Sequence, residues 1–99
     1  MTYTHIYEAD AQLEYEEAIL WYLEKSNQAS RNFELEINEK LKEICLKPTL
    51  YRNTKKYFRE ALLKKYPFSI IYFIDEEHHN IVITSVFHNS RNPKKKYTK

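Results

Sequence analysis

The side chains best suited to chemistry gather near the end of the chain, where a histidine, several basic residues and a tyrosine follow one another. They are His88, Arg91, Lys94, Lys95, Lys96 and Tyr97. Arg59 joins them if its strand pairs beside residues 67–75. Arginine and lysine hold phosphate groups, tyrosine stacks on bases, and histidine transfers protons near neutral pH. The pattern therefore favours a site for a phosphodiester or for nucleic acid.

A purely structural explanation of the same residues stays open. His88 could close a strand, and Arg59 could pair with Glu60 or with a carboxylate on a helix. The lysines could do no more than keep the chain soluble. The spacing of the residues alone does not separate this explanation from a working site.

Other kinds of chemistry find little support, and we expect neither a metal nor a cofactor. His78 and His79 lie in an acidic loop, but no further ligands follow at the spacing of a zinc site. Cys45 falls near the expected end of a helix, without the electropositive setting that activates a thiolate, so we interpret it as a core residue. A glycine-rich phosphate loop is impossible because the chain has no glycine.

Size and composition indicate one soluble domain over residues 1–99. A chain of 99 residues buries a limited core, and its nine tyrosines, five phenylalanines and one tryptophan compensate with large apolar side chains. A single cysteine excludes an internal disulfide and suits the reducing cytoplasm. No apolar run is long enough for a membrane span, and the first residues lack the pattern of a signal peptide.

The net charge of +2 hides an asymmetry between the two halves. Residues 1–50 hold ten acidic and five basic side chains, a net charge of −5, whereas residues 51–99 hold four acidic and eleven basic ones, a net charge of +7. Such a division is typical of a protein whose basic half meets a polyanion. It could equally reflect the preference of helices for glutamate.

The first half predicts a strand and two helices. Residues 2–7 alternate and favour β-structure. A helix is expected from an N-cap at Asp10 to about Lys25, and a second one over residues 28–46, closed by Pro48. Their short connection predicts an antiparallel hairpin. The first helix is apolar on two sides, so it should either lie wedged between neighbouring elements or offer one side to a partner. The second of these sides has Leu13, Leu20 and Leu23.

The second half changes to a period of two residues and predicts three strands, at 57–63, 67–75 and 80–88. Short loops make them an antiparallel meander. If Asp75 pairs with Asn80, one face is strongly apolar and should receive the helices; it holds Phe68, Ile70, Tyr72, Ile74, Ile81, Ile83 and Phe87. The opposite, uncovered face then holds Ser69, Ile71, Phe73, Val82, Thr84, Val86 and His88. A slip of one residue would exchange the two faces.

The expected fold is thus α+β: an N-terminal strand, an antiparallel two-helix hairpin, and a three-stranded antiparallel meander packed on the helices. The basic tail at residues 94–99 is expected to be flexible. In this arrangement the cationic residues of the last strand and tail lie on the uncovered face of the sheet.

The order of elements, together with particular residues, resembles the RelE/ParE superfamily of type II toxins over nearly the whole chain. In the first half the residues that carry the resemblance are Ala11, Leu13, Glu14, Ala18, Trp21, Tyr22, Phe33, Ile44 and Pro48. In the second half they are Arg59, Leu63, Tyr66, Pro67, Phe68, Ile71, Tyr72, Val86, Phe87, His88, Arg91 and Pro93.

The resemblance implies a toxin with a cognate antitoxin protein, for which the apolar side at Leu13, Leu20 and Leu23 is the expected contact. RelE-like members cut messenger RNA on the ribosome without a metal. For such a ribonuclease the implied catalytic residues are Arg59, His88, Arg91 and Tyr97. ParE-like members instead poison DNA gyrase, and here the target would meet Arg59 and the tail lysines 94–96.

Two features favour the ParE-like branch. The His-x-x-Arg-x-Pro ending and the strand Tyr-Pro-Phe-x-Ile-Ile-Tyr look closer to that branch, which includes plasmid stabilisation proteins. The net charge of +2 is also low for a ribosome-dependent nuclease of this superfamily. We therefore expect a gyrase inhibitor, with an endoribonuclease, or a non-toxic module that only binds the antitoxin, as the alternatives.

Overall fold

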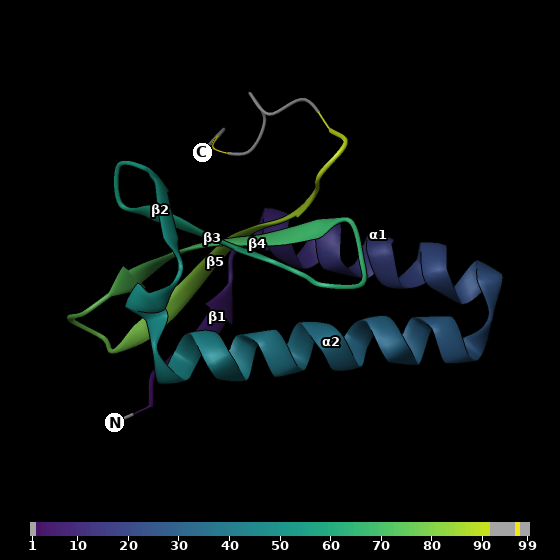
Figure 1. Cartoon of the computed structure of the whole chain (residues 1–99), viewed down its shortest axis with the longest axis horizontal. Coiled ribbons are helices and arrows are strands. Elements are labelled where there is room, and N and C mark those ends of the chain that lie inside the picture. The colour runs from purple at the N-terminus through teal and green to yellow at the C-terminus, as the bar shows by residue number, and fades with distance from the viewer. Residues whose placement is uncertain (1, 92–96, 98–99) are drawn as a thin grey trace.

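Two amphipathic helices joined through one residue form the first layer of the molecule (Figure 1). The computed structural model describes residues 2–91 and 97. Helix α1 (Ala9–Lys25) is followed at once by α2 (Asn27–Leu46). Ser26 separates them in an extended conformation, and its hydroxyl accepts the Ala29 N–H at 2.9 Å, which satisfies a free donor of the first turn of α2. The predicted antiparallel hairpin is confirmed, although α1 begins before Asp10, and Glu8 rather than Asp10 is its N-cap.

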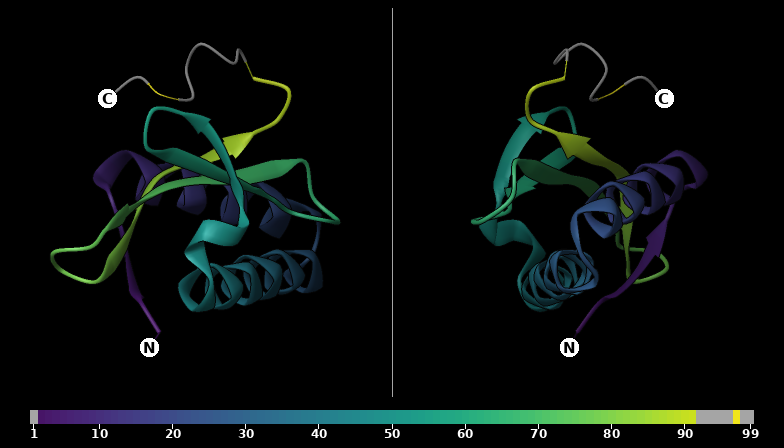
Figure 2. Two further views of the ribbon diagram at one scale, coloured as in Figure 1. Left: turned by 60° about the vertical axis from the view of Figure 1, so that its left-hand side comes forward. Right: turned by 90° about the vertical axis from the view of Figure 1, so that its right-hand side faces the viewer.

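The second layer is a five-stranded sheet in the order β1-β5-β4-β3-β2. Its strands are β1 (Thr4–Tyr7), β2 (Arg52–Lys55), β3 (Phe58–Leu62), β4 (Phe68–Asp75) and β5 (Asn80–His88). The last four form an antiparallel meander, and β1 joins the edge of β5 in parallel. Both helices lie on one side of this sheet (Figure 2). The α+β class and the order of elements are confirmed, with β2 as a strand that the sequence pattern missed.

The main core lies between the helices and the sheet. Phe33, Ile37, Leu41 and Ile44 of α2 are fully buried against inward-facing residues of β4 and β5. Each such side chain contributes about 1.5–3 kcal/mol through removal from water. Tyr72 also belongs here, and its hydroxyl donates to the Pro48 carbonyl at 2.6 Å, which ties the short 3-10 helix η1 (Pro48–Leu50) to β4. The end of α2 is therefore fixed to the middle of the sheet.

A bulge in β5 changes which side chains face the helices. Asp75 pairs with Asn80 as predicted, but Ile71 lies opposite Ser85 and Tyr72 opposite Ile83, so that Thr84 is an extra residue. Beyond Thr84, each side chain of β5 faces the side opposite to the one that strict alternation predicts. Val86 therefore joins the core under the helices, whereas Phe87 packs with Ile71 on the other face. The predicted places of Val86, Phe87 and His88 were wrong for this reason: His88 lies on the helix side.

Within the described residues, neither α1 nor α2 is apolar enough to cross a bilayer, because both helices are rich in charged side chains.

Candidate functional site

His88 ends β5 and turns its ring towards α1. The ring meets Phe68 of β4 edge to face, with 4.9 Å between the centroids. Its Nδ1 accepts the Ser90 N–H at 3.2 Å and lies 2.7 Å from the Ser90 hydroxyl. Because Nδ1 accepts a backbone N–H, the neutral ring has its proton on Nε2. His88 is thus a half-buried side chain whose ring is held by Phe68 and Ser90.

Glu14 of α1 connects the helix to the free edge of β5. One of its oxygens accepts the Val86 N–H at 3.0 Å and the Ser85 hydroxyl at 2.8 Å. The other oxygen pairs with Arg91 at 2.9 Å. Among the described residues no strand lies next to β5 beyond the end of β1, and this carboxylate accepts the backbone N–H that is exposed there. Glu14 therefore positions both α1 and Arg91 beside the end of β5.

These contacts frame a groove between α1 and the ends of β4 and β5, with a volume of about 350 Å³. Its lining consists of Glu14, Glu17, Ala18, Trp21, Tyr22, Pro67, Phe68, Val86, His88 and Arg91. The buried Ala18, Phe68 and Val86 form its floor, and the more exposed charged residues and His88 form its rim. We call it the α1–β5 groove. A concave apolar floor with a few polar groups at its margin suits a side chain of a protein partner.

Trp21 makes one wall of the α1–β5 groove and is 53% exposed. Its ring meets Tyr22 edge to face, and the Lys25 ammonium lies 4.5 Å from its centroid. A tryptophan held by neighbours yet open to solvent loses little conformational freedom on binding. In the sequence Trp21 stood only among the residues that carry the family resemblance, and no pattern marked it as a contact residue.

Arg59 lies away from this groove. It pairs with Tyr72 across β3 and β4, whereas His88 pairs with Phe68, four residues further along β4. Its guanidinium donates to the carbonyls of Tyr51 at 2.7 Å and Thr49 at 3.4 Å. These bonds hold the chain between α2 and β2. Arg59 therefore has a structural role in this conformation.

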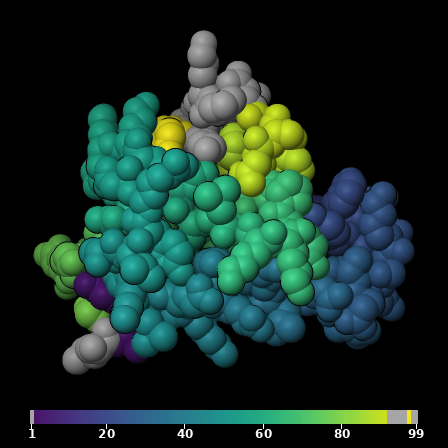
Figure 3. Space-filling model, viewed as in Figure 1, coloured from purple at the N-terminus to yellow at the C-terminus, as the bar shows by residue number. Residues whose placement is uncertain are grey.

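Tyr97 lies on the face of the sheet opposite to the helices. Its ring packs on Phe58 with 5.2 Å between the centroids, and its hydroxyl donates to Thr54. The Lys55 ammonium lies 5.5 Å from the ring centroid. In Figure 3 the yellow patch of residue 97 lies beside the teal β2 region. Residues 94–96 lie outside the described residues.

The structure thus divides the residues that the sequence grouped together. His88 and Arg91 meet at the α1–β5 groove, Arg59 lies further along the sheet on the same side, and Tyr97 lies on the other face. Residues that transfer protons around one phosphate must lie within hydrogen-bonding reach of it. In this conformation these four side chains do not share a site.

The leucines proposed for the antitoxin contact are open to solvent on α1. Leu13, Leu20 and Leu23 are 58%, 60% and 44% exposed. Single exposed leucines are common, but these three follow one helix next to Trp21. Leu13 and Leu20 lie four and three residues from Glu17, which lines the α1–β5 groove, so this part of the leucine surface adjoins the groove.

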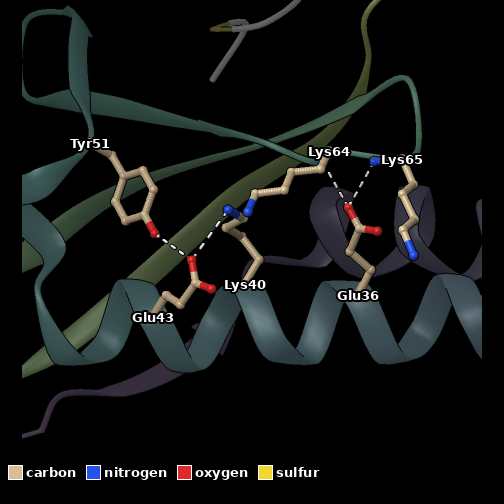
Figure 4. Close-up of polar contacts among 6 residues, drawn as sticks. All are labelled: Glu36, Lys40, Glu43, Tyr51, Lys64 and Lys65. Carbon is tan, nitrogen blue, oxygen red and sulfur yellow. Dashed lines mark hydrogen bonds and ion pairs between the residues drawn. The ribbon is translucent and has the colours of Figure 1, made fainter.

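A group of polar contacts fixes the loop between β3 and β4, which leads into Pro67 and Phe68 of the groove (Figure 4). Glu36 of α2 accepts the backbone N–H groups of Lys64 at 2.7 Å and Lys65 at 3.2 Å. The position of the loop is therefore set by α2.

A second carboxylate of α2 holds the chain that follows the helix. Glu43 accepts the Tyr51 hydroxyl at 2.9 Å and pairs with Lys40 at 3.3 Å (Figure 4). The hydrogen bond from Tyr51 lowers the pKa of Glu43, whereas burial raises the pKa of Tyr51 to about 12. Tyr51 therefore remains a neutral donor at physiological pH.

The acidic hairpin tip between β4 and β5 holds three groups that could ligate a metal. Oxygen or nitrogen atoms of Asp75, Glu77 and His78 lie within 4.8 Å of one another. His78 Nδ1 lies 2.9 Å from the Asp75 carboxylate, and this hydrogen bond lowers the pKa of Asp75. The sequence had offered no set of ligands at zinc spacing. The hairpin turn brings this set together at an exposed position.

Comparison with known proteins identifies the family. Residues 6–93 match the family model described as the ParE toxin of the type II toxin–antitoxin system parDE. The chain belongs to this family. It is accordingly a toxin of the RelE/ParE superfamily, as its sequence had indicated. A search of the curated proteins returned no match.

Two solved structures share the fold of this toxin. One is a chromosomal ParDE toxin–antitoxin system from P. aeruginosa, with a TM-score of 0.74 at 13% identity, covering 88% of this chain and 96% of that one. The other is the RelBE2 toxin–antitoxin complex from Mycobacterium tuberculosis, with a TM-score of 0.62 at 16% identity, covering 89% of this chain and 99% of that one. At these identities the likeness concerns the fold and does not select between a ParE and a RelE activity.

The residues that define the resemblance to the family converge on the α1–β5 groove. Of its ten lining residues, all except Glu17 are among those that carried the resemblance in the sequence. They come from α1, from the loop before β4 and from the end of β5, so proximity in sequence does not account for their meeting. Part of this set serves packing, since Ala18 and Val86 are buried, but Trp21, His88 and Arg91 remain accessible.

Proposed function

We propose that this toxin arrests growth by binding DNA gyrase, and that it acts as an inhibitory protein without catalysing a reaction of its own. The observation that carries the proposal is the α1–β5 groove, where an apolar floor, an exposed Trp21 and the His88–Arg91 rim make a site for a protein side chain. Hot spots of protein interfaces are rich in tryptophan and arginine around such pockets.

The separation of the candidate catalytic residues supports a binding function over a nuclease. A nuclease requires a proton donor or acceptor and cations around a single phosphate. Arg59 donates to two carbonyls, Arg91 pairs with Glu14, and Tyr97 lies on the other face from His88. Assembly of these groups would require several intramolecular contacts to break.

The basic residues of the second half complement this surface. Lysines 94–96 follow His88 and Arg91 in the sequence. We propose that they contact DNA held by gyrase, because cations near phosphates release counterions and strengthen binding. Arg59 belonged to the same predicted contact, and its guanidinium would have to leave the carbonyls of Thr49 and Tyr51 to take part.

A cognate antitoxin would neutralise the toxin by covering α1. Leu13 and Leu20 lie on the same side of α1 as Glu17, which lines the α1–β5 groove. An antitoxin helix or segment that buries these leucines therefore also covers one wall of the groove. Release of the antitoxin would open the surface that binds the target.

One observation favours the alternative of an mRNA endoribonuclease. Around Tyr97, aromatic and basic side chains meet on the open face, with Lys55 above its ring and Phe58 beneath. Stacking surfaces next to lysines suit single-stranded RNA. This cluster lacks His88, so a nuclease built on it would need another proton donor.

Induction of the chain in cells separates these functions. The proposal predicts growth arrest, accumulation of cleaved chromosomal DNA and an SOS response, with intact mRNA. Co-expression of the adjacent gene, if it encodes the antitoxin, should restore growth. Sequencing of RNA ends and gel analysis of chromosomal DNA would follow both targets after the same induction.

Two other outcomes would contradict the proposal. Rapid codon-dependent cleavage of mRNA with intact DNA would identify a ribosome-dependent nuclease. Normal growth with abundant folded protein would leave a non-toxic module that only binds the antitoxin.

A further inference from the structure

Ser90 and His88 form a hydrogen-bonded pair of a nucleophile and a base where β5 ends. The Ser90 hydroxyl lies 2.7 Å from Nδ1 of His88. A serine hydroxyl within this distance of an imidazole nitrogen is the arrangement by which proteins activate serine for attack on a carbonyl or phosphoryl group. The proposed binding of gyrase makes no use of this hydroxyl.

The backbone fixes the tautomer of His88 that a base requires. Nδ1 also accepts the Ser90 N–H at 3.2 Å, so the proton of the neutral ring is on Nε2 and the lone pair of Nδ1 is directed at Ser90. The hydroxyl therefore donates to Nδ1 instead of accepting from it. The edge-to-face contact with Phe68 holds the ring in this orientation. An activated serine needs a base that is itself oriented by a further group, and this pair meets that condition.

The Ser90 hydroxyl is also open to a reagent. Ser90 is exposed, whereas His88 beside it is half-buried. Ser69 and Ser85 of the neighbouring strands donate hydrogen bonds as well, but to a carboxamide and a carboxylate, and both of these serines are buried. Ser90 thus combines access from solvent with a base.

The surroundings of Ser90 suit an acyl group. His88 and Arg91, on either side of Ser90 in the sequence, line the α1–β5 groove, whose apolar floor and volume of about 350 Å³ have room for a short aliphatic chain. Arg91 also brings positive charge to the place where a carbonyl oxygen becomes negative during attack. Nη1 of Arg91 pairs with Glu14 at 2.9 Å, which holds the guanidinium beside the groove.

We propose that Ser90 is a modification site that accepts an acyl group from an activated ester or thioester, with His88 as the base and the acyl chain in the α1–β5 groove. Oγ of Ser90 bonds to the carbonyl carbon of the donor while Nδ1 of His88 takes the hydroxyl proton. The tetrahedral intermediate expels the alcohol or thiol, which leaves with that proton, and an ester of Ser90 remains. Gyrase plays no part in this reaction, so the inference stands or falls independently of the proposed function.

The first test follows the reaction of the full chain with p-nitrophenyl hexanoate. Mass spectrometry of the intact chain should show a hexanoyl adduct, and peptide mapping should place it on Ser90. Ser90→Ala should abolish the adduct at this position, whereas Ser90→Cys, which keeps a nucleophile there, should retain it. Thermal unfolding verifies that each variant folds.

A second pair of variants tests the base. His88→Ala should slow the acylation of Ser90 roughly 100-fold, because the hydroxyl loses its proton acceptor. His78→Ala is the matched control, since His78 is an exposed histidine that binds a carboxylate instead of a hydroxyl, and its removal should leave the rate unchanged. A purely structural role of His88 would lower the stability of the chain without changing the rate at which the folded chain reacts.

Comparison of two donors tests where the acyl chain lies. After division by the rates with free imidazole, the wild-type chain should react at least about tenfold faster with the hexanoyl ester than with the acetyl ester, because the longer chain buries more apolar surface. Trp21→Glu places a charge in the wall of the α1–β5 groove and should remove this preference. Leu62→Glu, equally exposed at 53% but outside the groove, should keep it.

Three results would overturn the inference. If the wild-type chain and Ser90→Ala acquire the same adducts, Ser90 is not an activated nucleophile. If folded His88→Ala acylates Ser90 as fast as the wild type, the contact between the two side chains only closes the turn after β5. If Trp21→Glu retains the preference for the hexanoyl ester, the acyl chain lies outside the α1–β5 groove.

Discussion

At the scale of single residues, most of the candidate catalytic groups already have a partner within the chain. Glu14 holds Arg91, the carbonyls of Thr49 and Tyr51 hold Arg59, and Ser90 holds Nδ1 of His88. Residue types alone could not reveal these partners, because they come from elements far apart in sequence.

His88 offers a prediction at this scale. On the binding account, His88→Ala removes one margin of the α1–β5 groove and should raise the concentration of toxin that inhibits gyrase about fivefold, equivalent to about 1 kcal/mol for an aromatic contact. His78→Ala, on the exposed hairpin, is the matched control and should have no effect. A general acid or base would instead lose roughly 100-fold in rate. Such a loss, with unchanged stability, would mean that His88 performs chemistry.

At the scale of elements, periodicity predicted the helical hairpin and three of the four meander strands. It missed β2, since Arg-Asn-Thr-Lys is short and polar and has no apolar alternation to detect. It also misplaced the end of β5. The extra residue Thr84 is invisible to a period of two, yet it moves Phe87 to the open face and His88 to the helix side. The candidate site therefore could not be assembled correctly from the pattern.

Substitution of Tyr72 tests the hydrogen bond that joins η1, at the end of α2, to β4 of the sheet. Tyr72→Phe leaves the buried carbonyl of Pro48 without its donor and should lower the free energy of unfolding by about 1–2 kcal/mol. Tyr57→Phe, on the exposed hairpin between β2 and β3, should change it by less than about 0.5 kcal/mol. Urea unfolding of both variants measures the difference. Equal stabilities would show that the bond between η1 and β4 contributes nothing.

At the scale of the whole molecule, both α1 and α2 line grooves of the surface. The α1–β5 groove gathers nine of the residues that carry the resemblance to the family, and a larger groove lies between residues 2–5 and α2. Both are concave and mainly apolar, as expected of a protein that acts through partners. The acidic helices and the basic second half are the two layers of this one fold.

We propose that the toxin poisons gyrase through the α1–β5 groove. The direct measurement is a cleavage assay with purified gyrase and plasmid DNA. Wild-type chain should accumulate gyrase–DNA cleavage complexes. Trp21→Glu should need at least about tenfold more protein, and Leu62→Glu, equally exposed at 53% but outside the groove, should match the wild type. If the wild-type chain causes no cleavage complexes, or if Trp21→Glu is as active as the wild type, the proposal is contradicted.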